Sequence, residues 1–169
     1  MNRTSTDNNN CIITVTGKGG AGKTVLSALM IKVLAKDRGL KILAIDADSS
    51  VSLPHALGIE VKRTVGEVRE SVINDPEAKR AVENQHIRDV MRSCLLRGPG
   101  FDLLVMGRGE GPGCFCHVND LLRYGIEALA KEYDVVVVDG EAGPEQINRR
   151  VVSKIDRLMM VADTSTRAF

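Results

Sequence analysis

Short apolar runs recur along the chain and predict the strands of one sheet. Within each run, apolar side chains follow one another almost without interruption, and Gly, Asp or charged residues mark the ends. Strands with this pattern are buried on both faces, which is typical of a parallel sheet covered by helices on both sides. The runs are CIITVT at 11–16, KILAID at 41–46, FDLLVMG at 101–107, DVVVVDG at 134–140 and RLMMVAD at 157–163.

Between the runs, apolar residues recur every three to four positions and predict helices over 24–37, 76–93, 118–132 and 145–154. Strands that alternate with helices predict an α/β fold with a doubly wound, mainly parallel sheet. A chain of 169 residues is within the usual range for one domain. We assign that domain to 11–169 and expect residues 1–10 to be a disordered lead-in, because MNRTSTDNNN offers almost nothing to bury.

Composition limits the possible partners. The net charge is +1, so there is no bulk electrostatic attraction to nucleic acid or to an anionic membrane, and we expect neither partner. The polar N-terminus is unlike a secretory signal, and no apolar run reaches the roughly 18 residues of a membrane span. We therefore expect a reducing, cytoplasmic location, where four unevenly spaced cysteines favour free thiols or metal ligands over disulfides.

A phosphate loop is predicted at GKGGAGKT, residues 17–24, because its Gly-x-x-x-x-Gly-Lys-Thr spacing lies between a predicted strand and a predicted helix. Glycines let the backbone N–H groups form a concave ring around phosphate oxygens, and the helix start adds a favourable dipole. Lys23 is expected to meet the β- and γ-phosphates, and the Thr24 hydroxyl is expected to ligate Mg²⁺. The predicted nucleotide contacts in the loop are Gly17, Gly19, Gly20, Ala21, Gly22, Lys23 and Thr24.

Carboxylates end two of the predicted strands. Asp139 follows four valines, where a carboxylate of the Walker B type holds Mg²⁺ through water. Asp46 and Asp48 lie two residues apart, and therefore on one side of an extended chain, from which both can reach the phosphates. For Asp46, a structural role as a turn or helix cap is about equally compatible with the sequence.

The stretch KGGAGKT resembles the deviant phosphate loop of the ATPase family that includes MinD, ParA, nitrogenase iron protein, ArsA and CooC, and the resemblance spans most of the chain. It implies an ATP-hydrolysing homodimer in which Lys18 reaches the partner's phosphates; the alternative for Lys18 is a solvated surface lysine. It also implies that Asp48 orients the attacking water and that Asp46 contacts water molecules on Mg²⁺. The segment GEAG at 140–143 then corresponds to switch II, with Gly143 as the γ-phosphate sensor.

Two thiols lie in a loop rich in glycine, GRGEGPGCFCHVND at 107–120. Cys114 and Cys116 supply two thiolates, whereas a tetrahedral zinc-type site needs four ligands. A two-fold axis would bring both pairs together and complete a site shared by two subunits. The alternative is a pair of small buried side chains. His117 is a weaker ligand candidate, and Cys11 and Cys94 are expected to pack in the core.

This loop and the GEAG segment resemble the CooC branch of the family. The resemblance implies an ATP-dependent metallochaperone that carries Ni²⁺ or Zn²⁺ to carbon monoxide dehydrogenase or acetyl-CoA synthase. An iron–sulfur protein related to nitrogenase iron protein is the runner-up, although no cysteine follows 116. A MinD- or ParA-type positioning ATPase and a metal-binding module without nucleotide are further alternatives. Family members normally continue beyond VADTSTRAF into the adenine pocket, so we expect hydrolysis to depend on that region.

Overall fold

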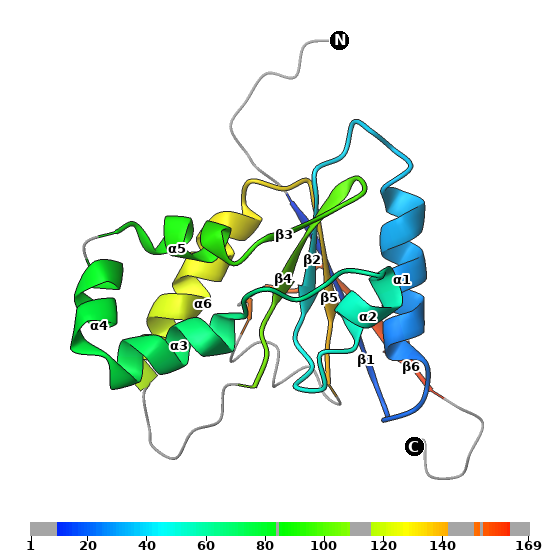
Figure 1. Cartoon of the computed structure of the whole chain (residues 1–169). Helices are drawn as coiled ribbons and strands as arrows, with labels where there is room; N and C mark the ends of the chain where they lie inside the picture. The colour runs from blue at the N-terminus through cyan, green and yellow to red at the C-terminus, as the bar shows by residue number, and fades with distance from the viewer. Residues whose placement is uncertain (1–9, 84, 109–115, 142–150, 153, 163–169) are drawn as a thin grey trace.

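In the computed structural model, the described residues are 10–83, 85–108, 116–141, 151–152 and 154–162, and they form a six-stranded sheet (Figure 1). Its spatial order is β3-β4-β2-β5-β1-β6. All neighbouring pairs are parallel except β3 with β4, which confirms the predicted doubly wound, mainly parallel α/β fold. The strands are β1 (Cys11–Gly17), β2 (Ile42–Asp46), β3 (Leu96–Gly98), β4 (Phe101–Val105), β5 (Val135–Asp139) and β6 (Arg157–Val161).

Helices cover both faces of the sheet. Figure 1 shows α1 (Lys23–Leu34) and α2 (Leu53–Leu57) on one side. On the other side lie α3 (Val65–Asn74), α4 (Pro76–Glu83), α5 (Ile87–Ser93) and α6 (Cys116–Ala130). The side chains of β2 alternate between two cores: Ala44 packs in the same cluster as Ile31 of α1, and Ile45 in the same cluster as Ile126 of α6. Burial on both faces explains why the central strands are continuously apolar.

The five predicted strands are confirmed, whereas several other elements differ. The sequence reading missed β3, a three-residue strand that turns back antiparallel onto β4 through Gly100 at φ 85°. The helix predicted over 76–93 is two helices, because His86 has extended backbone before α5 begins. The prediction also missed α2 and α3. Of the helix predicted over 145–154, the described residues 151, 152 and 154 are not helical, and the others lie outside the described residues.

The prediction that every strand is covered on both faces is wrong for β6. Within the described part of the chain, β6 pairs with β1 alone, and four successive residues from 157 to 160 are exposed, so side chains on both faces are open to solvent; Met160 is 71% exposed. The outer face of α1 is also apolar, with Val25, Leu29 and Val33 spaced four residues apart and each more than half exposed. Leu158 and Met159 of β6 are exposed as well.

None of the described helices combines the length and the apolar character that a membrane crossing requires.

Candidate nucleotide-binding site

The phosphate loop joins β1 to α1, as predicted. Gly20 and Gly22 have φ values of 80° and 94°, a left-handed backbone that favours glycine and turns successive N–H groups in one direction. Gly22 caps α1 without a side-chain hydrogen bond, so the first N–H groups of the helix lack a side-chain acceptor. A Cβ added at Gly19, Gly20 or Gly22 would meet no atom within 4 Å. The loop is therefore an open backbone cradle of the kind that binds anions.

Gly17 and Lys23 lie at the two ends of the phosphate loop, and each makes a close contact there. A Cβ at Gly17 would overlap the backbone carbonyl of Val161, so glycine is required there for the close approach of β6. Lys23 is buried, and its Nζ donates to the backbone carbonyl of Lys18 at 3.2 Å, which holds the ammonium inside the loop. Lys18 itself is exposed, and its reach toward a partner subunit stays a prediction.

Asp139 is a buried carboxylate at the end of β5. Its Oδ1 accepts a hydrogen bond from Ser27 Oγ at 2.8 Å, and the Thr24 hydroxyl lies near the same carboxylate. Its Oδ2 is buried and has no hydrogen-bond partner among the described residues. Burial raises the pKa of Asp139, while the two hydroxyls and the Lys23 ammonium oppose the rise. A buried oxygen without a donor is suited to a cation or to a water molecule on a cation.

Sequence reasoning missed Ser27. This serine is fully buried on α1, one turn after Lys23, and it contacts a residue 112 positions away in the chain. The signal in the sequence was a small hydroxyl residue at the i+4 position from the phosphate-loop lysine, on the helix face that turns toward the sheet. Ser27 orients Asp139 through its hydroxyl.

Asp46 lies opposite Asp139 in the register of β2 and β5. Its Oδ1 accepts from the backbone N–H of Asp48 and its Oδ2 from that of Leu53, both at 3.1 Å, and Leu53 is the first residue of α2. Burial raises the pKa of Asp46 to about 7; the two N–H groups lower it, and the charges of Asp139 and Asp48 raise it further. This is the geometry of a turn and helix cap, which the sequence left open beside the magnesium role.

Asp48 lies on the loop after β2 and is half-buried. Its Oδ1 accepts from the backbone N–H of Ser50 at 2.8 Å, and its charge acts on both Asp46 and Asp139. The site therefore gathers three carboxylates beside the phosphate cradle. Of their oxygens, Asp139 Oδ2 is the one that is buried without a hydrogen-bond partner among the described residues, and carboxylate oxygens suit Mg²⁺. The residues present thus fit a magnesium–nucleotide complex.

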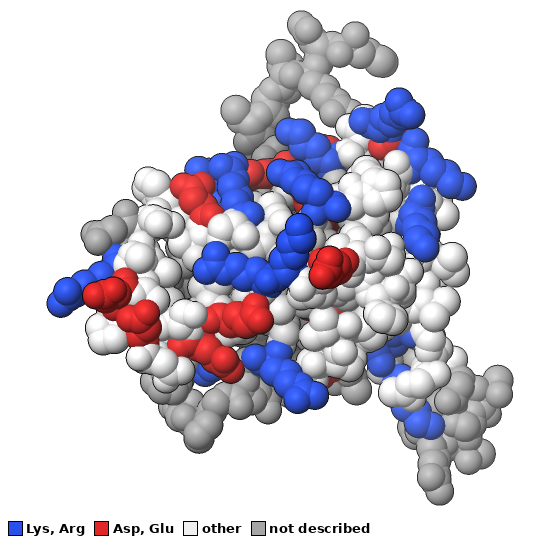
Figure 2. Space-filling view, viewed as in Figure 1, with Lys and Arg blue, Asp and Glu red and all other residues white. Residues whose placement is uncertain are grey.

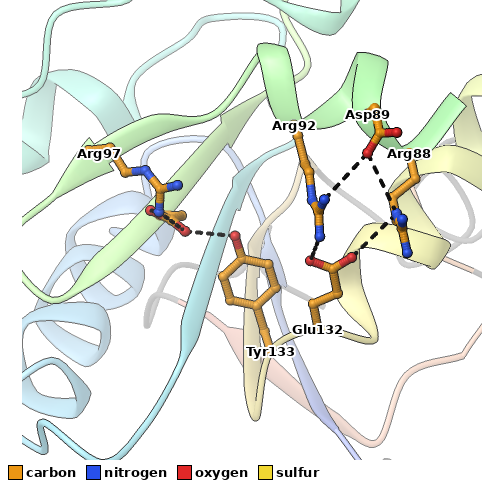
Figure 3. A network of polar contacts seen from close by, with 7 residues as sticks. Arg88, Asp89, Arg92, Arg97, Glu132 and Tyr133 are labelled. Atoms are coloured by element: carbon orange, nitrogen blue, oxygen red, sulfur yellow. Dashed lines mark hydrogen bonds and ion pairs between the residues drawn. The ribbon is translucent and has the colours of Figure 1, made fainter. Parts of the chain in front are cut away.

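A hollow of about 710 Å³ lies at the end of the sheet opposite the phosphate loop, beside the β3–β4 hairpin. Several of its polar groups already have partners: Arg97 contacts Asp102 at 2.6 Å, Tyr133 Oη donates to Asp102 at 2.7 Å, and Arg92 contacts Glu132 at 2.5 Å. Figure 3 shows Arg92 and Glu132 pointing toward each other. Figure 2 likewise shows Lys and Arg interspersed with Asp and Glu on this face. We therefore assign the candidate site to the phosphate-loop end.

The predicted thiol site can be placed only in part. Cys114 and Gly143 lie outside the described residues, and Cys116 is described only as the first residue of α6. Where the structure describes side chains, no group of three or more His, Cys, Asp or Glu is arranged to hold a metal ion. Cys94 is buried, which confirms its predicted core position, and Cys11 is partly buried.

Comparisons with known proteins identify the family. The family model described as the CobQ/CobB/MinD/ParA nucleotide binding domain matches residues 12–164. An uncharacterized ATP-binding protein of Methanocaldococcus jannaschii is 45% identical over 166 residues, which is 92% of this chain and 63% of the relative. The carbon monoxide dehydrogenase accessory protein CooC of Rhodospirillum rubrum is 30% identical over 169 residues, 92% of this chain and 64% of CooC.

Among solved structures, the septum site-determining protein MinD of Pyrococcus horikoshii, in complex with Mg-ADP, superimposes with a TM-score of 0.63 at 20% identity. The match covers 94% of this chain and 60% of MinD. The chain thus spans somewhat less than two thirds of the length of these relatives. The family model and the open phosphate cradle lead to one conclusion: the chain belongs to the CobQ/CobB/MinD/ParA family of nucleotide-binding P-loop domains.

Proposed function

We propose that this protein is an ATP-dependent metallochaperone, in which ATP binding and hydrolysis control a metal ion held by Cys114 and Cys116 of two subunits. The observation that carries the nucleotide part is the buried Asp139 Oδ2, which has no partner in the described chain and lies beside an open phosphate cradle. The 30% identity to CooC over most of the chain supports the metal part.

In this proposal the backbone N–H groups of residues 19–22 and the Lys23 ammonium bind the phosphates. The Thr24 hydroxyl and the Asp139 carboxylate would hold Mg²⁺. Bound Mg²⁺ would neutralise negative charge on the phosphates. Ser27 keeps the Asp139 carboxylate oriented, and Asp48 accepts a hydrogen bond from the water that attacks the γ-phosphate. Asp46 holds the Asp48 loop and contacts the hydrated cation. Lys18 of each subunit contacts the phosphates bound to the other.

The cargo would be Ni²⁺ or Zn²⁺, because thiolate ligands accept either ion. One chain supplies two thiolates in a Cys-x-Cys pair, and a homodimer supplies the four of a tetrahedral site. A nickel enzyme such as carbon monoxide dehydrogenase or acetyl-CoA synthase would receive the ion. Nucleotide-dependent changes in the dimer would alter the distance between the two thiol pairs and therefore the affinity for the metal.

The test is equilibrium dialysis of anaerobic protein against Ni²⁺ and, separately, Zn²⁺, with and without Mg-ATP. The proposal predicts one metal ion per two chains, lost in the Cys114→Ser, Cys116→Ser double variant and kept in Cys11→Ser, a matched thiol in β1. Metal binding that survives the double variant would reject the thiol site. Mg-ATP binding without any metal uptake would favour a positioning ATPase of the MinD type.

A further inference from the structure

Besides the backbone hydrogen bond from Ala47 N–H to the Asp139 carbonyl at 2.9 Å, a side-chain contact between described residues joins the two loops that carry the site's carboxylates. Ser49, next to Asp48, donates to Glu141 Oε1 from its backbone N–H at 3.1 Å and from its Oγ at 2.6 Å. Glu141 lies two residues after Asp139, and 92 positions separate it from Ser49. Two donors on one carboxylate oxygen form a charge-assisted pair that fixes both the main chain and the side chain of Ser49.

The Glu141 end of this contact is anchored to the central sheet. Its backbone carbonyl accepts from Thr16 Oγ1 at 2.9 Å, and Thr16 is buried in β1. The N–H of Gly140, one residue earlier, donates to the carbonyl of Val15 at 2.9 Å. The carboxylate of Glu141 therefore projects from a backbone that β1 holds in place.

The Ser49 end belongs to a strained turn. Val51 has φ 53°, and among the described residues it is the one non-glycine residue with a positive φ. A β-branched residue in this region is a conformational outlier, and such a residue persists only where the surrounding contacts hold it. The turn is closed by the N–H of Val51 donating to the Asp48 carbonyl at 3.1 Å. The Glu141 contact is the side-chain link between this turn and the loop after β5.

We propose that Glu141 is a positioning residue that holds Asp48 in register with Asp139 by binding Ser49. The inference rests on the proposed function, in which Asp48 orients water and Asp139 holds magnesium. If the backbone at Glu141 moved, its two hydrogen bonds would move Ser49 with it. Asp48, one residue away in the chain, would then move as well. Glu141 thus links the loop after β5 to the loop after β2 without contacting the phosphates itself.

Hydrogen exchange of the nucleotide-free protein tests the contact without reference to activity. In Glu141→Ala, the amide of Ser49 loses its acceptor, and we expect exchange across residues 47–52 to accelerate about tenfold or more. Glu141→Gln keeps an acceptor oxygen and should restore most of the protection. Glu60→Ala, an exposed glutamate on the loop before α3, is the matched control. Equal exchange in the parent, Glu141→Ala and Glu141→Gln proteins would overturn the proposal.

Steady-state ATP hydrolysis then tests the consequence. Glu141→Ala should lower kcat about tenfold with little change in KM, and Glu141→Gln should recover most of the rate. Adding Ser49→Ala to Glu141→Ala should cost little more, since both act through one contact. A parent protein that does not hydrolyse ATP would reject the proposed function, and the exchange experiment would still decide the contact. An unchanged kcat in Glu141→Ala beside an active parent would reject the positioning role.

Discussion

Raising the pH should destabilise the protein when magnesium and nucleotide are removed, because Asp46 is buried in its folded state. Its pKa is about 7 in the folded chain against an ordinary value of 3.8. Between these two values the folded protein keeps a proton that the unfolded chain has released. Stability is therefore greatest at low pH in this window, falls as the pH rises, and has lost this contribution once the pH exceeds about 7.

The size of the effect follows from the difference in bound protons. Between about pH 5 and pH 8, the folded protein binds close to one proton more than the unfolded chain over nearly two pH units. Each pH unit is worth about 1.4 kcal/mol, so the free energy of unfolding falls by roughly 2–3 kcal/mol. Asp139 adds a loss of the same sign, since burial raises its pKa as well. Urea unfolding at the two pH values, in a chelator and without nucleotide, measures the difference.

Asp46→Asn removes the titration and should shrink this pH difference by about 2 kcal/mol. The substitution also weakens one of the two hydrogen bonds from Asp48 and Leu53, but that cost is present at both pH values and cancels in the difference. Asp120→Asn, an exposed carboxylate on α6, is the control. An undiminished pH difference in Asp46→Asn, or a parent protein that gains stability as the pH rises, would refute the reasoning.

Three further predictions concern the loop, the helix behind it and the open sheet edge. Lys23→Ala should weaken Mg-ATP binding about a hundredfold, measured by calorimetric titration, because the phosphates lose a charged donor; near-parental affinity would contradict the assigned role. Ser27→Ala should lower the free energy of unfolding by about 1–3 kcal/mol, because Asp139 Oδ1 loses a buried donor; an unchanged urea midpoint would argue against that contact. Met160→Lys on the exposed edge strand β6 should reduce concentration-dependent light scattering, whereas Tyr124→Lys, similarly exposed on α6, should reduce it less.

Local spacing predicted the phosphate loop well, because its geometry is determined by adjacent residues. The glycines at 20 and 22 take the left-handed backbone that the motif requires, and α1 begins at Lys23, one residue before the predicted start at 24. The carboxylates were predictable for a related reason. Asp46 and Asp139 end neighbouring parallel strands, and such strand ends meet at one edge of the sheet.

Contacts between distant segments were not predictable. Ser27 binds Asp139 only because α1 packs over β5, and Ser49 binds Glu141 only because two loops end side by side. The start of α3 is a different case: Thr64 and Glu67 form a capping box, a signal that was present in the sequence and was overlooked. The exposure of β6 depends on which elements pack against it. An apolar run in the sequence predicts a strand, but it does not show whether other elements cover that strand.

Native mass spectrometry of anaerobically prepared protein, with Mg-ATP and with nickel or zinc, tests the central claim most directly, because it reads subunit number, nucleotide and metal in one spectrum. The account predicts a dimer that carries two nucleotides and one metal ion. It also predicts that Cys114→Ser with Cys116→Ser removes the metal alone, and that Lys23→Ala removes the nucleotide. A monomer free of metal and nucleotide under every condition would contradict the account.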